Sequence, residues 1–341
     1  MRKLFVTGGA GFIGSAFIRL CLEADDAPEI INFDLLTYAG NPDNLIGLEG
    51  EKYHFVQGDI ADRSAVLNAL DQNTSAIVNF AAESHVDRSI ISADEFLRTN
   101  ILGTQVLLDA ARELGIPRFV QVSTDEVMGS LPESADEYFT EDSPFAPNSP
   151  YAASKAAAEH LVRAAHHTFG LDTVITRCGN NYGPRQFPEK FLPLAITNAL
   201  NDEPIPVYGD GKNVRDWIFV EDHCRAILLA LHHGDSGAVY NIGARNERKN
   251  MDVIESLLDA LGKSRSLIRF VKDRPGHDRR YAIDPSLAET ELGWSPVETW
   301  NSGLQKTIDW YMQNPEWSDR ARSGAYRAYY KKQYGSEVGT V

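Results

Sequence analysis

Cysteine and long apolar runs are both scarce in this chain. Its 341 residues include three cysteines, Cys21, Cys178 and Cys224, which show no CxxC or Cys/His ligand spacing. Neither a disulfide framework nor a metal site is therefore predicted, and a reducing, cytoplasmic location is expected. No stretch approaches the roughly 18 apolar residues of a membrane span, and Gly8 lies in a glycine-rich turn that no apolar leader precedes. Neither a membrane segment nor a secretion signal is predicted.

Positive charge is also in short supply. The chain has 33 Lys and Arg residues against 48 Asp and Glu, which gives a net charge of -15 at pH 7. A protein of this charge repels polyanions, so nonspecific binding to nucleic acid or to anionic membranes is not expected. A local basic site for a small anion is still compatible with this net charge. The hydrophobic fraction of 43% is enough for a large core, in one long domain or two coupled ones.

What the chain does contain is an alternation of short β-rich runs and helical patterns. Runs such as KLFVT (3–7), AIVNF (76–80) and FVQVS (119–123) are apolar at successive positions, and stretches of helical periodicity separate them. Strands that are apolar on both faces belong to a parallel sheet covered by helices on each side. The prediction is an α/β fold, a Rossmann-type doubly wound parallel sheet with a smaller mixed α/β C-terminal substrate domain.

The pattern changes after Cys178, where loops rich in Gly, Pro and Asn mix with shorter helices. We expect residues 1–178 to form the first domain and residues 179–213 and 241–335 to form the second. The segment 214–240 has helical periodicity and is expected to pack back on the first domain, so the boundary is not a single cut.

A dinucleotide site is predicted at the first turn, TGGAGFIGS. Gly8, Gly11 and Gly14 stand between a strand and a helix, where glycine lets the backbone approach a pyrophosphate at the helix N-terminus. Asp34 ends the second strand and can accept from both ribose hydroxyls, which favours NAD over NADP. Asp59 and Ile60 follow the third strand, where an adenine edge would lie, although Asp59 could equally cap the next helix. The alternative is a plain glycine turn with a surface aspartate.

Two further stretches carry reactive side chains. Ser123 to Glu126 read STDE and place two carboxylates where an apolar strand ends; the alternative is a solvated turn. Tyr151 and Lys155 are four apart in a helical run, so they share one face, and the cation is expected to lower the pKa of the phenol and make it a base toward a sugar hydroxyl. Here the alternative is an amphipathic helix with a surface lysine.

Taken together, these features resemble the extended short-chain dehydrogenase/reductases. Within that group AAESHVDRSI (81–90), STDEV (123–127), YGDGKNVRDWIFVEDHC (208–224) and DRPGHDRRYAID (273–284), together with NNYGP and FPEK between 180 and 190, are similar to those of the dTDP-glucose 4,6-dehydratases. The resemblance covers nearly the whole chain. It implies an NAD-dependent lyase of deoxysugar biosynthesis that acts on a nucleoside-diphosphate hexose, most simply dTDP-glucose, and gives the 4-keto-6-deoxy sugar.

The resemblance also implies a role for each reactive side chain. Tyr151, assisted by Lys155, would deprotonate the hydroxyl at sugar carbon four as hydride leaves that carbon for NAD. Glu126 would remove the proton at carbon five, and protonated Asp125 would donate to the departing hydroxyl on carbon six. Thr124 would hydrogen-bond the hydroxyl at carbon four. Neighbouring residues of a strand point to opposite sides, so Asp125 and Glu126 can share a substrate only if the chain turns there.

The remaining candidate residues fall into two groups. Arg215 has a planar fork suited to a diphosphate, and similarity adds Arg274, His277 and Asn250 near the phosphates or ribose, with Pro206 and Tyr208 at the base. Candidate substrate contacts are completed by Ser84, Thr124, Asn180, Glu189, Lys190 and Phe191, and candidate cofactor contacts by Phe12, Ile13, Leu35, Thr37, Ala81, Ala82, Ser84, Thr99, Ser123, Asn181, Tyr151 and Lys155. For each of these singly, a structural role is a comparable explanation.

Three positions depart from the family pattern. Similarity leads us to expect tyrosine at Met128, serine at Gly179 and an aromatic residue at Arg185. A change at Met128 could reshape the pocket around the sugar or nicotinamide. The alternatives are therefore a dehydratase that acts on a UDP-hexose or a UDP-N-acetylhexosamine. Such an enzyme could also release a 5,6-unsaturated sugar before the hydride returns. Less favoured are a 4-epimerase or decarboxylase, which need no adjacent acid and base, and a non-catalytic NAD-binding protein. A homodimer is expected, with helices near 98–113 and 151–168 at its interface.

Overall fold

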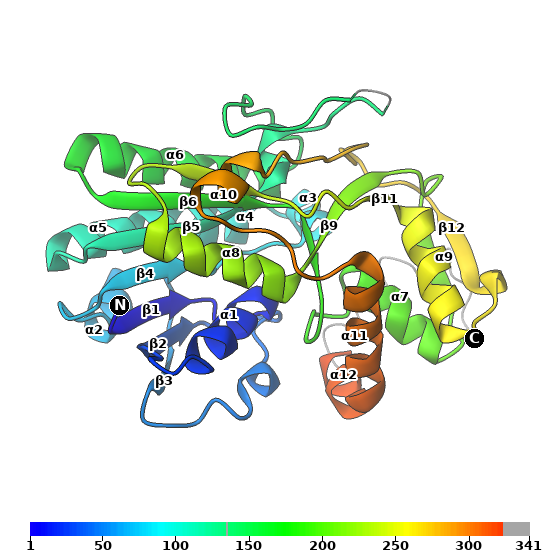
Figure 1. Ribbon diagram of the computed structural model, residues 1–341, viewed down its shortest axis with the longest axis horizontal. Coiled ribbons are helices and arrows are strands. Elements are labelled where there is room, and N and C mark those ends of the chain that lie inside the picture. The colour runs from blue at the N-terminus through cyan, green and yellow to red at the C-terminus, as the bar shows by residue number, and fades with distance from the viewer. Residues whose placement is uncertain (134–135, 323–341) are drawn as a thin grey trace.

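The computed structural model describes residues 1–133 and 136–322 (Figure 1). Its centre is a parallel seven-stranded sheet in the order β10-β6-β5-β4-β1-β2-β3. Most of these strands are buried along nearly their whole length, as expected for a sheet covered on both faces. The predicted fold class is confirmed. The strands are β1 (Lys3–Thr7), β2 (Glu29–Asp34), β3 (Tyr53–Gln57), β4 (Ala76–Asn79), β5 (Arg118–Thr124), β6 (Asp172–Cys178) and β10 (Val239–Ile242).

A layer of helices covers each face of this sheet (Figure 1). Helices α1 and α8 lie against one face, where Phe17 and Ile227 are fully buried with strand residues such as Val6. Helices α2, α5 and α6 cover the other face around Leu107 and Val162. These helices are α1 (Phe12–Leu22), α2 (Arg63–Ala69), α5 (Thr104–Leu114), α6 (Pro150–Phe169) and α8 (Val220–His233), and shorter ones link them: α3 (Val86–Ile91), α4 (Asp94–Phe96), η1 (Pro42–Leu45), η2 (Leu97–Gly103) and η3 (Asp125–Met128).

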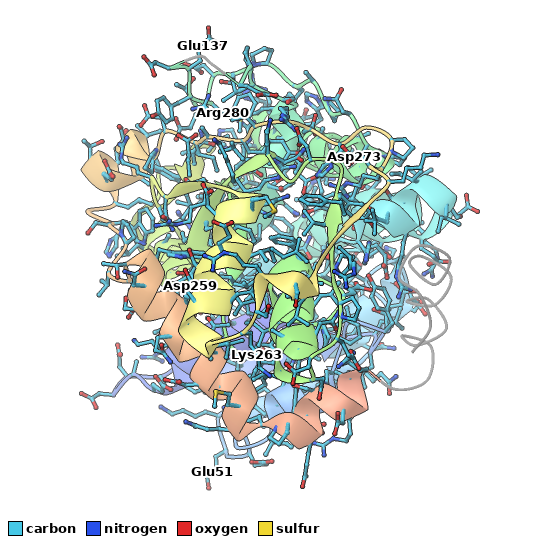
Figure 2. All side chains as sticks on the ribbon, turned by 90° about the vertical axis from the view of Figure 1, so that its right-hand side faces the viewer. Glu51, Glu137, Asp259, Lys263, Asp273 and Arg280 are labelled. Atoms are coloured by element: carbon cyan, nitrogen blue, oxygen red, sulfur yellow. The ribbon has the colours of Figure 1, made fainter. Side chains whose placement is uncertain are left out.

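A smaller region adjoins the carboxyl edge of the sheet, at the right of Figure 1 and facing the viewer in Figure 2. Its own core gathers Tyr182, Trp217 and Trp300, whose rings lie within 6.1 Å of one another. It comprises the sheet β11-β9-β7 and the pair β12-β8, made of β7 (Asn180–Tyr182), β8 (Ile205–Tyr208), β9 (Val214–Phe219), β11 (Glu247–Lys249) and β12 (Ile268–Val271), with helices α7 (Phe191–Leu200), α9 (Asn250–Leu261), η4 (Arg265–Leu267), α11 (Trp300–Gln313) and α12 (Pro315–Ala321). Helix α10 (Ser286–Glu291) lies against β10.

Strands of the large sheet connect to strands of the smaller region three times. Only Gly179 separates β6 of the large sheet from β7 of the small one, and β9 continues directly into α8. Strand β10 then leads back to β11. The segment 214–240 is thus divided, because β9 pairs with β7 and β11 whereas α8 packs on the large sheet. The proposed division into domains stays a prediction, and its last part, residues 323–335, lies outside the described residues. No helix within residues 1–133 and 136–322 has the length and apolarity to cross a membrane.

Candidate active site

A cavity of about 300 Å³ opens at the carboxyl ends of the strands, beside the neighbours β1 and β4. The strand order reverses at this point, and doubly wound sheets bind ligands there. Every predicted cofactor and catalytic residue lines the cavity, as do some predicted substrate residues: Gly8, Gly11, Phe12, Ile13, Gly14, Asp34, Leu35, Thr37, Asp59, Ile60, Ala81, Ala82, Ser84, Thr99, Ser123, Thr124, Asp125, Glu126, Tyr151, Lys155, Asn180, Asn181, Glu189 and Lys190. Their roles stay predictions.

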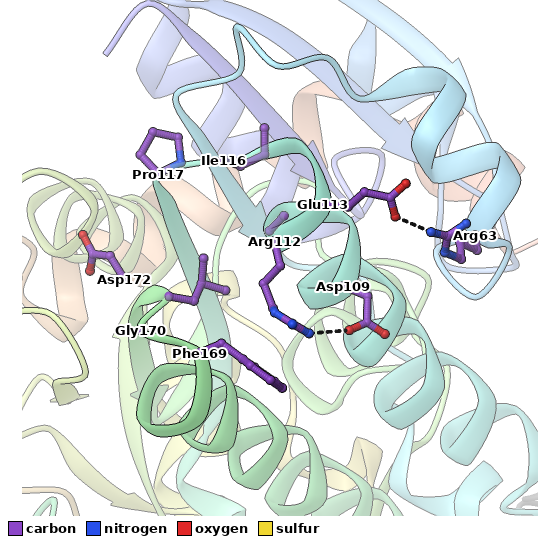
Figure 3. Close-up of a pocket in the computed structure, with 12 residues that line it drawn as sticks. Arg63, Asp109, Arg112, Glu113, Ile116, Pro117, Phe169, Gly170 and Asp172 are labelled. Carbon is purple, nitrogen blue, oxygen red and sulfur yellow. Dashed lines mark hydrogen bonds and ion pairs between the residues drawn. The ribbon is translucent and has the colours of Figure 1, made fainter.

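A larger cavity, of about 760 Å³, lies at the opposite edge of the sheet, where α5 and α6 end and β5 and β6 begin (Figure 3). Its arginines are matched by neighbouring carboxylates, Arg63 by Glu113 and Arg112 by Asp109. None of the predicted site residues lines it. Size alone therefore does not identify the functional site.

The glycine turn has the shape that a pyrophosphate needs. Gly8 has φ +69°, and a Cβ there would lie 2.6 Å from the Ala81 backbone nitrogen. A Cβ at Gly14 would come within 2.3 Å of the Gly8 carbonyl oxygen. Gly11, the N-cap residue of α1, has no side chain to cap the helix, so the first amides of α1 are available to an anion.

Asp34 is held at the end of β2 by backbone donors. Its carboxylate accepts hydrogen bonds from the Ala10 amide at 2.9 Å and the Leu36 amide at 2.8 Å, and burial raises its pKa. Asp59 accepts from the Ala61 amide at 2.8 Å. The alternative that Asp59 caps the next helix is wrong, because Asp62 accepts from the first amides of α2.

The turn that the carboxylates require is present. Strand β5 ends at Thr124, and the chain enters the 3-10 turn η3 at Asp125, so both Asp125 and Glu126 reach the cavity. The Thr124 hydroxyl stabilises this turn by accepting from the Glu126 amide at 3.3 Å. The structure thus meets the geometric condition that the sequence analysis set for a shared substrate.

The pKa values of Asp125 and Glu126 are both raised by burial, but to different extents. The pKa of Asp125 lies well above its usual value because the group is desolvated and because the charge of Glu126 is adjacent. Burial also raises the pKa of Glu126, but the positive charges of Arg274, Arg215 and Lys190 oppose the rise. Glu126 is therefore the group that ionises first and Asp125 the one that keeps its proton, which suits a base and an acid respectively.

Tyr151 and Lys155 lie on the first turns of α6, whose N-terminus Ser149 caps. The Lys155 ammonium donates to the Val122 carbonyl at 2.7 Å, and burial lowers its pKa to about 8. The prediction that lysine lowers the pKa of Tyr151 is wrong for this structure. Burial and the neighbouring charge of Glu126 raise the pKa of that phenol well above its usual value.

Three residues that line the cavity have a buried polar atom without a partner among the described residues: the Ser123 hydroxyl, Oδ2 of Asp125 and Oε1 of Gln186. Orphaned groups of this kind are costly unless a ligand or water satisfies them. Together with the glycine turn and Asp34, they fit a dinucleotide lying across β1, β4 and β5. Asn181 is placed beside them by His223, whose Nδ1 lies 2.9 Å from its side-chain oxygen.

The structure does not bring the other predicted substrate residues into the lining of this cavity; these are Phe191, Pro206, Tyr208, Arg215, Asn250, Arg274 and His277. They lie in the smaller region, where Arg215 donates to the Asp278 carbonyl at 2.8 Å. His277 Nδ1 lies 2.6 Å from Asp273, which Figure 2 labels on the segment after β12. Phe191 is partly buried and packs against the core near Trp217.

Sequence reasoning missed Asp87, a buried carboxylate on α3. Arg274 donates to one of its oxygens and the Tyr208 hydroxyl to the other, each at 2.9 Å. It also missed Glu83, which lines the cavity with a pKa raised to about 7 by burial. Both lie in the AAESHVDRSI stretch, where charged residues shortly after the end of β4 were the available signal.

The three departures have structural explanations of different kinds. Met128 is buried away from the cavity, where its sulfur lies 3.7 Å from Arg177, so it does not shape the pocket as expected. Glycine fits at position 179 because a Cβ there would lie only 2.7 Å from the Asp216 carbonyl oxygen. Arg185 lies outside the cavity lining.

Fold and site together define an NAD-dependent enzyme of the short-chain dehydrogenase/reductase type. Comparison with family models matches residues 5–307 to the family described as GDP-mannose 4,6 dehydratase. The dTDP-glucose 4,6-dehydratase of Xanthomonas campestris pv. campestris (strain B100) is 51% identical over 348 residues, covering 96% of this chain and 98% of the relative. The dTDP-glucose 4,6-dehydratase of Salmonella typhimurium is 45% identical, and the match covers 97% of this chain and 99% of the relative.

Solved structures agree. DesIV (dTDP-glucose 4,6-dehydratase) from Streptomyces venezuelae, with NAD and TYD bound, has a TM-score of 0.90 and 49% identity over 94% of this chain and 99% of that one. The UDP-glucose 4-epimerase of Thermus thermophilus, in complex with NAD, has a TM-score of 0.85 and 30% identity over 92% of this chain and 99% of that one. The chain belongs to the dTDP-glucose 4,6-dehydratase family.

Proposed function

We propose that this protein is an NAD-dependent lyase that converts dTDP-glucose into dTDP-4-keto-6-deoxyglucose. The observation that carries the proposal is the pair of buried Asp125 and partly buried Glu126, which line one cavity at a strand end with Tyr151 and Lys155. A 4-epimerase or a decarboxylase has no use for an adjacent acid and base. The names of the relatives at 45–51% identity support the same activity.

NAD is the cofactor, and the residues around the glycine turn fit it. The amides at the start of α1 would hold the pyrophosphate, and Asp34 would accept from the adenosine ribose. Ser123, whose hydroxyl has no partner among the described residues, would face the nicotinamide half. When bound, NAD accepts a hydride from carbon four of the sugar and returns it to carbon six.

Tyr151 takes the proton of the carbon-four hydroxyl in this scheme. Its raised pKa makes the phenolate a strong base but a rare one, so the positive charge of oxidised nicotinamide and of Lys155 would have to favour it. Thr124, at the end of β5, is placed to hydrogen-bond the same hydroxyl. The ketone formed at carbon four then acidifies the proton at carbon five.

Glu126 and Asp125 carry the elimination. Glu126, whose ionised form is favoured by the charges of Arg274, Arg215 and Lys190, removes the proton at carbon five, and protonated Asp125 donates to the hydroxyl that leaves carbon six. One water is expelled and the carbon–carbon double bond forms. Hydride return to carbon six and protonation at carbon five complete the reaction with no net oxidation.

The nucleotide half of the substrate would lie in the smaller region. Arg215 and Arg274 supply positive charge for the diphosphate, and Asn250 and His277 lie on neighbouring segments. Tyr208 and Pro206 on β8 would flank the base, while Lys190 and Asn180 reach the sugar from the cavity lining. Glu189 is ion-paired to Arg88 at 3.2 Å and would position the loop that carries Lys190.

The test is to incubate the purified protein with dTDP-, UDP-, GDP- and CDP-hexoses and identify the products by mass spectrometry and NMR. Loss of one water from dTDP-glucose, with a new keto signal, is the expected result. Preferential turnover of a UDP-sugar would reassign the nucleotide. Recovery of every sugar unchanged would refute the activity.

The protein is further inferred to act as a homodimer in a reducing, cytoplasmic setting. Three free, buried cysteines support the reducing setting. Leu97 and Leu102, in the segment η2 that contacts helix α5, are 48% and 50% exposed, and exposed apolar side chains there support a second copy as partner. Replacing Leu102 by Glu should convert a dimer to a monomer in light scattering; an unchanged mass would exclude this face.

A further inference from the structure

A third cavity, of about 400 Å³, lies between α1, the η1 turn and the α11–α12 pair, apart from the active-site cavity. In a protein with a net charge of -15 it gathers three arginines. The arginines are Arg19, Arg185 and Arg320, and Trp310 and Trp317 also line the cavity. The two carboxylates, Asp43 and Glu316, are both paired with Arg320, at 2.6 Å and 3.6 Å.

The other two arginines have no carboxylate partner among the described residues. Arg185 lies over the Trp310 ring, 5.4 Å from its centroid, and makes no hydrogen bond or ion pair within residues 1–133 and 136–322. Arg19 donates to two backbone carbonyls, those of Asn44 and Ile46, each at 2.7 Å. Burial and the charge of Arg19 lower the pKa of Arg185 to about 10, although the carboxylate of Glu221 opposes the shift, so the two cations repel one another in a poorly solvated place.

The backbone supports a ligand role for Arg185 as well. Arg185 has φ +68°, a left-handed conformation that glycine adopts at no steric cost. An arginine that is strained, half-buried and unpaired contrasts with those of the cavity in Figure 3, where each guanidinium has a carboxylate partner. A buried cation without a partner is stabilised by an anion that enters beside it.

A chain of hydrogen bonds connects this cavity to the NAD site. The Trp317 indole donates to the Asn44 side-chain oxygen at 3.0 Å, and the Asn44 amide donates to the Ala10 carbonyl at 3.0 Å. The Ala10 amide in turn donates to Asp34 at 2.9 Å. Arg19 holds the same turn through the Asn44 carbonyl. Any ligand that fixes Arg19 and Trp317 therefore restrains Ala10, the residue whose amide orients the Asp34 carboxylate.

We propose that this cavity is a second binding site, for a small phosphate-bearing anion held by Arg185 and Arg19, and that its occupancy tightens the hold on NAD. The coupling is reciprocal, because a ligand that strengthens NAD binding is itself bound more tightly when NAD is present. The site is separate from the diphosphate site proposed for the sugar nucleotide, which lies in the smaller region near Arg215 and Arg274.

The binding experiment uses inorganic pyrophosphate and calorimetry on protein saturated with NAD and dTDP, so that the other anion sites are filled. Wild type should bind one pyrophosphate saturably, and Arg185→Gln should bind it at least tenfold more weakly. Arg112→Gln is the matched control, since it removes a carboxylate-paired arginine that lies over Phe169. Equal affinity in all three proteins, or no saturable binding to wild type, would overturn the site.

Arg185→Gly guards against a folding artefact, because glycine relieves the left-handed backbone while it removes the charge. It should lose pyrophosphate binding and unfold no more easily than wild type. Retained binding would refute the role of the guanidinium. If dTDP fails to bind wild type, the substrate assignment fails, but the dependence on Arg185 still decides the second site.

The coupling has its own readout, the rate of NAD release after mixing with a trap for the free cofactor. Pyrophosphate should slow release at least threefold in wild type and not in Arg185→Gln. Trp317→Phe keeps the ring but removes the donor to Asn44, so it should still bind pyrophosphate while NAD release no longer responds. A full response in Trp317→Phe would refute the hydrogen-bond route, and no response in wild type would refute the coupling.

Discussion

Replacing Glu126 by Gln separates the first oxidation from the elimination. The change keeps the shape of the side chain and leaves the Glu126 backbone amide, which donates to Thr124, in place. It removes the base at carbon five and also the charge that raises the pKa values of Tyr151 and Asp125. We therefore expect removal of the carbon-four hydride to survive, because the phenol becomes easier to deprotonate, and elimination to fail.

The size of the loss follows from the role. Positioned acid–base groups accelerate a reaction by about 10²–10⁴-fold, and each factor of ten corresponds to about 1.4 kcal/mol of barrier. The activation free energy of turnover should therefore rise by about 3–5 kcal/mol. In single-turnover experiments the absorbance of reduced nicotinamide should rise and persist. Deuterium from solvent should not enter carbon five.

Tyr151→Phe is the matched control, since it should block the absorbance change itself. If the Glu126→Gln protein incorporates deuterium at the wild-type rate, another group is the base and the assignment is wrong. If neither variant reduces the cofactor, the mutation has disturbed binding rather than the elimination, and a binding isotherm for dTDP-glucose decides this.

Three further substitutions test separate parts of the site. Arg274→Gln removes a charge that lowers the pKa of Glu126, so that pKa rises and the acid limb of the kcat–pH profile should move to higher pH; a shift to lower pH would contradict the electrostatics. Gly179→Ser places a side chain 2.7 Å from the Asp216 carbonyl and should cost about 1–3 kcal/mol in urea unfolding, and full stability would show that the neighbours yield freely. Asp34→Ala should weaken NAD binding and narrow the preference over NADP in fluorescence titrations, and an unchanged preference would remove Asp34 from the ribose site.

Local sequence was enough to predict the parts of the site that depend on one turn or one strand end. Gly8 and Gly14 lie where no Cβ fits, and Asp34 ends its strand beside them. The turn after Thr124 was foreseen as a condition, because alternate side chains of a strand cannot share one ligand. These features follow from rules of spacing that act within a few residues.

The rest depends on partners that are remote in sequence. Asp87 and Arg274 are 187 positions apart, and no pattern along the chain pairs them. The pKa of Tyr151 was predicted in the wrong direction because helical spacing identifies Lys155 as a neighbour but says nothing of the burial that opposes it. Met128 was placed at the pocket for a similar reason, since its distance from Glu126 along the chain does not reveal the side to which it turns.

The three strand connections between the large sheet and the smaller region restrict how the enzyme can move. A single linker would let the two parts swing widely, whereas these three connections, at Gly179, Phe219 and the β10–β11 turn, and the two chain segments on either side of α10 must all bend together. Opening for sugar entry is consequently confined to small rotations, and a protease that cuts one connection leaves both halves joined. Neither half can be expressed as one continuous fragment with its sheet complete.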